Sequence, residues 1–233
     1  MKRIAIITAR GGSKRIPHKN IKDFCGQPII SYTILAAKEC GLFDEVMVST
    51  DSEQIAEIAL KYGAVVPFYR SAATSNDYAT TADVLNEVLA QYKELGKEYD
   101  VLCCLYPTAP FVTSNKLIDA EKLLREGDID AVIPVVKFDF PPQRGFVLDD
   151  NRRMRYWFPE HALTRSQDLK PIYHDCGQFY FCKTEAFLRE GTLIVPKALP
   201  YIMPHTEVQD IDTLEDWKLA EQKYLQLVGG EVE

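Results

Sequence analysis

Short apolar runs alternate with segments of helical periodicity over the first 136 residues. The runs are rich in β-branched residues and have the length of strands buried on both faces, whereas apolar residues recurring every three or four positions are typical of amphipathic helices. This alternation predicts a parallel sheet with crossover helices. The predicted strands are Ile4 to Ile7, Glu45 to Thr50, Ala64 to Phe68, Asp100 to Leu105 and Ala131 to Val136, and the predicted helices are Ile29 to Cys40, Glu53 to Tyr62, Ala82 to Leu95 and Asn115 to Glu126, the last one capped by Ser114.

The pattern is interrupted between Val136 and the next strand-like run, Gln178 to Cys182. This interval of about 40 residues is far longer than the 2 to 6 residues usual for a connection in such folds. It is rich in Phe, Tyr, Trp and Arg, so residues 137–172 are interpreted as a small excursion that buries its aromatic residues against a second subunit. An active-site lid within one chain is the alternative.

The chain then returns to the main domain, which is expected to comprise residues 1–136 and 173–233. A short helix is predicted near Thr184 to Arg189. Thr213 is predicted to cap a last helix that ends near Val228, followed by a frayed tail from Gly229 to Glu233.

Composition narrows the class of protein. The length of 233 residues is enough for one sizeable core, and the net charge of -7 argues against a nucleic-acid binder. No run is long enough to cross a membrane, and none near the N-terminus reads as a signal peptide. The six cysteines lack metal-site spacing, which together with the missing signal predicts a reducing cytoplasm.

The loop after the first strand carries the strongest chemical signal. Gly11, Gly12 and Ser13 can bring backbone N–H groups close to an anion, and they are surrounded by Arg10, Lys14, Arg15, Lys19 and Asn20. A loop at the carboxyl end of a strand faces the ligand site in an open α/β sheet, so this segment is interpreted as a phosphate cradle. The spacing matches neither the Walker motif nor Gly-x-Gly-x-x-Gly. A solvated basic turn is the alternative.

Two carboxylates stand near the other end of the chain. Asp210 and Asp212 flank the apolar Ile211, so in an extended segment both point to one side while the isoleucine packs inward. Such a pair suits Mg²⁺, which prefers a few carboxylates together with phosphates and waters. The alternative is that Asp212 or Thr213 only caps the final helix.

The order Ala9-Arg10-Gly11-Gly12-Ser13-Lys14 followed by Lys19-Asn20 resembles the opening signature of the CMP-sugar synthetases, which use CTP to activate nine-carbon 2-keto sugar acids such as sialic acid. Later landmarks agree, so the resemblance covers nearly the whole chain. It implies a Rossmann-like α/β fold of the nucleotide-diphospho-sugar transferase type, a mostly parallel sheet flanked by helices with a small dimerisation excursion. It also implies a homodimer.

The resemblance further implies the roles of particular residues. CTP would be bound by the first loop, Arg70, Thr80 and Tyr106, and Arg10, Lys14 and Lys19 would neutralise the leaving pyrophosphate. Asp210 and Asp212 would hold Mg²⁺. Arg165 would contact the acidic sugar or a phosphate from across the dimer. A surface salt bridge is the alternative for Arg70.

The identity of the sugar depends on two departures from the sialic acid pattern. Tyr106 stands where a glutamine is usual, in Leu105-Tyr106-Pro107-Thr108-Ala109-Pro110, and Cys176-Gly177-Gln178-Phe179-Tyr180 replaces Asn-Gly-x-x-Tyr. The second pattern is similar to that of the pseudaminic acid cytidylyltransferases, and a less polar pocket lined by Tyr106 and Phe179 would suit a 6-deoxy sugar. Thr108, Gln178 and Tyr180 are the other expected substrate contacts. Sialic acid, legionaminic acid and the eight-carbon sugar acid of lipopolysaccharide stay open as substrates, as do a sugar-phosphate nucleotidyltransferase and a non-catalytic nucleotide-binding protein.

Overall fold

The computed structural model describes residues 1–229, so the tail predicted to fray lies almost wholly outside the described residues. Most of the predicted elements are present within one or two residues of their expected ends. The strands are β1 (Arg3–Thr8), β2 (Asp23–Phe24), β3 (Gln27–Pro28), β4 (Glu45–Ser49), β5 (Val101–Leu105), β6 (Ala131–Lys137), β7 (Phe146–Leu148), β8 (Met154–Tyr156), β9 (Tyr173–Asp175), β10 (Phe179–Lys183) and β11 (Ala198–Ile202). The α-helices are α1 (Ile29–Glu39), α2 (Glu53–Lys61), α3 (Thr81–Glu94), α4 (Ser114–Leu124), α5 (Thr184–Glu190) and α6 (Leu214–Gly229).

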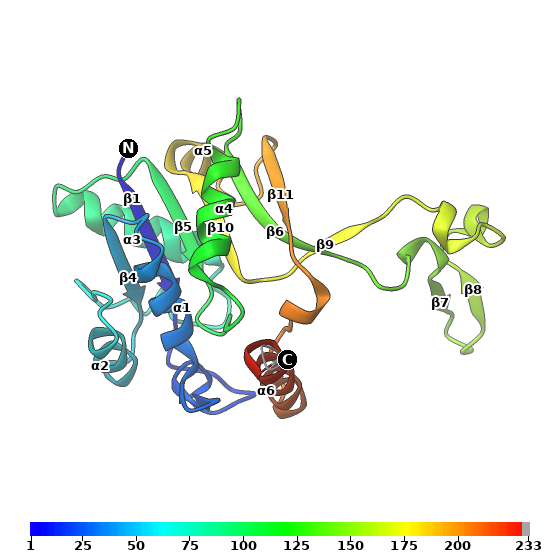
Figure 1. Ribbon diagram of the computed structural model, residues 1–233, viewed down its shortest axis with the longest axis horizontal. Helices are drawn as coiled ribbons and strands as arrows, with labels where there is room; N and C mark the ends of the chain where they lie inside the picture. The colour runs from blue at the N-terminus through cyan, green and yellow to red at the C-terminus, as the bar shows by residue number, and fades with distance from the viewer. Residues whose placement is uncertain (230–233) are drawn as a thin grey trace.

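The main sheet has the order β11-β6-β10-β5-β1-β4, and β9 pairs with the end of β6 (Figure 1). Strands β4, β1 and β5 run parallel, as do β6 and β11. Strand β10 lies between β5 and β6 and runs antiparallel to both. The prediction of a mostly parallel sheet flanked by helices is therefore confirmed, with β10 as the inverted strand at its centre.

Alternate residues of each central strand enter separate apolar clusters on the two faces of the sheet. Ala5 and Ile7 of β1 pack with α1, α2 and α4, whereas Ile4 and Ile6 pack with α3 and α5. Because successive strand residues point to opposite faces, a strand covered on both sides must be apolar throughout, and β1 is. The adjacent Cys103 and Cys104 of β5 divide between the same two clusters.

A third apolar cluster joins the two ends of the chain. Ile16 of the first loop and Phe24 of β2 pack with Ile211, Trp217 and Ala220, which belong to the segment before α6 and to α6 itself. Trp217 and Phe24 lie edge to face with ring centroids 5.6 Å apart. This cluster holds the basic loop and the acidic segment against each other, although nearly 200 residues separate them in sequence.

Two expectations for the secondary structure were wrong, and several strands were not predicted. Residues 64–68 form no strand, because only Val65 bridges to Met47 of β4 before Pro67, which has no N–H, ends the pairing. Strand β11, at the edge of the main sheet, is one of the unpredicted strands, and its edge position is where a sheet tolerates a proline such as Pro200. Helix α4 is capped by Thr113, whose hydroxyl accepts from the Lys116 amide, and Ser114 is already helical.

The excursion leaves the sheet through a two-stranded stem. The end of β6 pairs antiparallel with β9, from Val135–Asp175 to Lys137–Tyr173. Beyond the stem the chain forms the β7–β8 hairpin and short 3-10 turns, and Figure 1 shows this part projecting sideways from the edge of the main body. Within residues 1–229, no helix is both long and apolar enough to span a membrane.

Candidate active site

The first loop follows β1 at the carboxyl edge of the sheet and is tied down at several points. The Ala9 amide donates to the Ser49 carbonyl at 2.9 Å, and the Asn20 side-chain amide donates to the Arg10 carbonyl at 2.9 Å. The Gly11 amide donates to the Asp51 carboxylate at 2.7 Å, so this N–H, which we expected to face a phosphate, already has a partner. A Cβ on Gly11 would lie 3.0 Å from the Ser52 Cβ, so close packing against the start of α2 explains this glycine.

The cations of the loop gather at one hollow of about 450 Å³. Its walls include Arg10, Lys14, Arg15 and Lys19 from the loop, together with Asp77 from the segment before α3. Arg10 and Lys14 both bind the Asp77 carboxylate, and the Arg10 Nη1 to Asp77 Oδ1 distance is 2.5 Å. The cradle is thus a cluster of several positive charges with one carboxylate among them.

The acidic segment lies against the same loop. Ile211 is 2% exposed in the third apolar cluster, while the Asp210 and Asp212 carboxylates lie on the solvent side, as the alternation predicted. Lys19 Nζ donates to the Ile211 carbonyl at 2.8 Å and lies 3.7 Å from Asp212 Oδ1. Burial lowers the pKa of Lys19, and the nearby Asp212 opposes that shift.

The start of α6 shows which residues cap this helix. The Thr213 hydroxyl accepts from the Asp216 amide at 3.2 Å, while the Thr213 amide donates to the Asp216 carboxylate at 2.8 Å. Thr213 and Asp216 therefore form the cap, as predicted for Thr213. The Asp212 carboxylate is instead paired with Arg15 at 2.7 Å.

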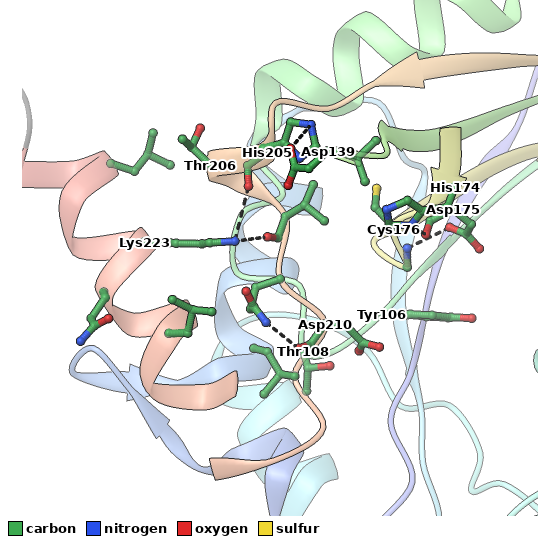
Figure 2. A pocket seen from close by; sticks show the side chains of 18 of the residues that line it. Tyr106, Thr108, Asp139, His174, Asp175, Cys176, His205, Thr206, Asp210 and Lys223 are labelled. Carbon is green, nitrogen blue, oxygen red and sulfur yellow. Dashed lines mark hydrogen bonds and ion pairs between the residues drawn. The ribbon is translucent and has the colours of Figure 1, made fainter. Parts of the chain in front are cut away.

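A larger cavity of about 1170 Å³ opens beside the first hollow (Figure 2). The two share Lys19, Tyr106 and Thr108 as lining residues. Figure 2 shows Tyr106, Thr108 and Asp210 together at one end of the larger cavity, with His205, Thr206 and Lys223 toward the other. The basic loop and the acidic segment consequently meet around joined hollows.

The inverted strand β10 brings the second sequence motif to this cavity. Because β10 runs antiparallel to β5, its start lies beside the end of β5, where the Tyr106 amide donates to the Gln178 carbonyl at 2.9 Å. Tyr180 points to the cavity and donates to Asp175 at 2.7 and 2.8 Å. The Tyr106 hydroxyl lies 3.2 Å from the Thr81 hydroxyl, and burial raises the pKa of Tyr106.

Two expected substrate contacts are corrected by the same strand. Phe179 is fully buried on the opposite face of the sheet, where it packs against Phe181 and Tyr201, so it does not line the cavity. Gln178 is 3% exposed, and its side-chain amide donates to the Glu207 carbonyl at 2.8 Å. Strand alternation explains the error for Phe179, since its neighbour Tyr180 is the residue that faces the cavity.

Arg70, Thr80 and Arg165 lie outside both hollows. Arg70 is buried and donates to the Ser49 carbonyl at 2.8 Å, so it is not a surface salt bridge, and burial lowers its pKa. Thr80 caps α3 in a reciprocal pair with Asp83. Arg165 is exposed on the excursion, where it binds Asp168 at 2.7 Å.

The sequence interpretation missed several polar residues of the site. Asp77 was not considered, although it lies between Arg70 and Thr80, and Asp175 stands two residues before Gly177. His205, which the sequence interpretation did not include, lines the larger cavity and lies 3.2 Å from an Asp139 oxygen. Proximity to an already chosen motif was the only sequence signal for Asp77 and Asp175.

The carboxylates of Asp210 and Asp212 are ligands of the kind that Mg²⁺ takes when it also binds a phosphate. Within residues 1–229, no group of three or more His, Cys, Asp or Glu side chains could enclose a metal. The Asp210 carboxylate lines the larger cavity and the Asp212 carboxylate pairs with Arg15 of the first hollow, and a Mg²⁺ held by these two oxygen donors would need further oxygens from a ligand and water. This matches the way Mg²⁺ is usually bound at nucleotide sites.

Comparison with known proteins finds cytidylyltransferases among the proteins similar to this chain. The family model described as Cytidylyltransferase matches residues 4–192. The pseudaminic acid cytidylyltransferase of Campylobacter jejuni (serotype O:2) is 42% identical over 96% of this chain and 97% of that protein. The N-acylneuraminate cytidylyltransferase A of Danio rerio is 36% identical over 95% of this chain and 50% of that protein.

A solved structure of a CMP:2-keto-3-deoxy-manno-octonic acid synthetase complexed with CTP covers 97% of this chain and 100% of its own, with a TM-score of 0.69 and 16% identity. That likeness shows the fold, which agrees with the nucleotide-diphospho-sugar transferase type.

Proposed function

We propose, because the chain belongs to the cytidylyltransferase family, that it transfers CMP from CTP to the anomeric hydroxyl of pseudaminic acid and releases pyrophosphate. The observation that carries this proposal is the meeting of the basic loop and the acidic segment, joined by the Lys19 contact to the Ile211 carbonyl. The near full-length relative at 42% identity, named pseudaminic acid cytidylyltransferase, supports the choice of sugar.

The chain supplies charges that suit this reaction. Attack on the α-phosphorus of CTP develops negative charge on the leaving pyrophosphate, and we assign its neutralisation to Arg10, Lys14 and Lys19, which line one hollow. Asp210 and Asp212 would hold Mg²⁺, which, when bound, neutralises charge on the attacked phosphate. Asn20 fixes the shape of the loop by its bond to the Arg10 carbonyl.

The larger cavity is proposed to take the sugar. It adjoins the phosphate hollow at Tyr106 and Thr108, and its walls include the Asp175–Tyr180 pair, which can bond amide and hydroxyl groups. Among the described residues, the Lys and Arg side chains that line this cavity are Lys19 and Lys223, and both already donate to backbone carbonyls. We therefore assign the sugar carboxylate to Arg165 of a second subunit.

The excursion, residues 137–172, is proposed to form the contact between two subunits. It exposes apolar side chains away from the main body, with Leu163 98% and Phe140 88% exposed. Apolar side chains so exposed are usual at the core of an interface.

The six cysteines are free, which supports a reducing cytoplasmic location.

The double variant Phe140→Asp, Leu163→Asp is expected to be monomeric, because it places two charges where the proposal puts an apolar interface. Light scattering after size-exclusion chromatography gives the mass directly. Leu60→Asp on α2, where Leu60 is 57% exposed, is the control and should leave the mass unchanged. A dimer that persists in the double variant at micromolar concentration would place the interface elsewhere.

The activity itself is tested with a panel of substrates. The native protein with CTP and Mg²⁺ is expected to release pyrophosphate with pseudaminic acid, more slowly with sialic and legionaminic acids, and not with a sugar 1-phosphate. Mass spectrometry of the product should give the CMP-sugar. Turnover of a different 2-keto acid as the best substrate would correct the sugar alone, turnover of a sugar phosphate would favour the other nucleotidyltransferase class, and CTP binding without any turnover would favour a non-catalytic protein.

A further inference from the structure

Asp77 places a carboxylate among the cations of the first loop. Its two oxygens are divided between Arg10 and Lys14, with 2.5 Å from Oδ1 to Arg10 Nη1 and a direct bond from Lys14 Nζ to Oδ2. These are two of the three cations that the proposed function assigns to pyrophosphate. The hydrogen bonds from Lys14 and Arg10 lower the pKa of Asp77, so it is ionised at neutral pH.

The segment that carries Asp77 is anchored on both sides of this residue by bonds that do not involve it. Ser71 donates its amide to Glu87 at 2.7 Å, and Thr74 also bonds Glu87. On the other side Thr80 caps α3. Between these anchors the Asn76 side chain accepts from the Tyr78 and Ala79 amides, which shapes a local turn. Asp77 can therefore leave the cations without uncapping α3 or disturbing the bonds to Glu87.

The ion pairs that hold Asp77 are easily separated by a stronger anion. The side chains of Asp77, Arg10 and Lys14 are 39%, 37% and 78% exposed, so solvent screens both pairs. Asp77 contributes one negative charge, whereas a pyrophosphate group carries several and can bind both cations at once. In the proposed reaction CMP keeps only the attacked α-phosphate, whereas Arg10 and Lys14 are assigned to the leaving pyrophosphate, so CMP can bind without displacing Asp77.

We propose that Asp77 is an internal competitor for the phosphate-binding cations, displaced only by an anion that binds Arg10 and Lys14 together, so that it selects nucleotides by the length of their phosphate chain. This inference rests on the proposed function for the assignment of the two cations. After transfer, the return of Asp77 to Arg10 and Lys14 favours the release of pyrophosphate. The carboxylate thus weakens the binding of CTP and of pyrophosphate, but not that of CMP.

The test compares the native protein with Asp77→Asn by calorimetric titration, using inorganic pyrophosphate and CMP as separate probes without added metal. Loss of two exposed pairs predicts about three- to tenfold tighter pyrophosphate binding. CMP affinity is expected to change less than twofold, and the gain for pyrophosphate should shrink as salt is raised. Glu98→Gln makes the same change in net charge at a residue 3.8 Å from Lys93, outside the hollows, and should change neither affinity.

The opposite result would overturn the inference. Weaker pyrophosphate binding in Asp77→Asn would mean that Asp77 orients Arg10 and Lys14 for the ligand, and equal tightening for pyrophosphate and CMP would mean a general charge effect. If neither protein binds pyrophosphate, then Arg10 and Lys14 do not form an anion site and the inference is refuted. Because these titrations need no turnover, failure to activate any sugar acid would refute the proposed function and leave this result standing.

Discussion

Asp212→Asn is expected to lower the rate of CMP transfer about 10²- to 10³-fold, the usual cost of removing one group that stabilises developing charge. The substitution keeps the shape of the side chain but removes the charge that pairs with Arg15 and Lys19 and that we propose holds Mg²⁺. The fold should persist, because the cap of α6 is made by Thr213 and Asp216 and the packing by Ile211. Pyrophosphate release at saturating CTP, over a range of Mg²⁺ concentrations, measures the loss.

Glu215→Gln is the matched control for this experiment. Glu215 lies exposed in the first turn of α6, three residues beyond Asp212. The substitution Glu215→Gln removes one negative charge, as Asp212→Asn does. It should retain native activity and native dependence on Mg²⁺. If Asp212→Asn transfers CMP at more than a tenth of the native rate, or if both variants fall equally, the acidic segment has no special place in the reaction.

Phe179→Ala is expected to reduce the free energy of unfolding by about 3–5 kcal/mol, as is usual when a buried phenylalanine is truncated. Phe179 is fully buried at the centre of the sheet, packed against Phe181 and Tyr201, so the change leaves a cavity. The Michaelis constant for the sugar should stay near the native value at temperatures where the variant is folded. Urea denaturation followed by circular dichroism gives the stability.

Tyr180→Phe provides the contrast from the other face of β10. It removes a hydroxyl that holds Asp175 at the cavity, and a single hydrogen bond costs only about 0.5–1.5 kcal/mol of stability. Here the Michaelis constant for the sugar should rise while stability falls little. A variant of Phe179 that stays stable but loses affinity for the sugar would restore its place in the substrate pocket.

The local patterns in the sequence were enough to predict most helices and strands of the sheet. The apolar run of β1, the helical spacing of α2 and the Ile211 that separates two aspartates each depend on neighbours in sequence, and each is present in the structure. The first loop could also be singled out from the sequence, because glycines and cations that follow a buried strand predict an anion site. The resemblance to a family added the expected roles of individual residues.

The tertiary structure decided what depends on partners distant in sequence. The sequence of Phe179–Lys183 does not indicate that β10 runs antiparallel between two parallel strands. This orientation nevertheless puts Tyr180 at the cavity and Phe179 in the core. Pro200 could stand in a strand only because that strand lies at the edge. Asp77 reaches Arg10 across 67 residues. Periodicity records which side of an element is apolar, but the partner on that side is set by the packing of the whole chain.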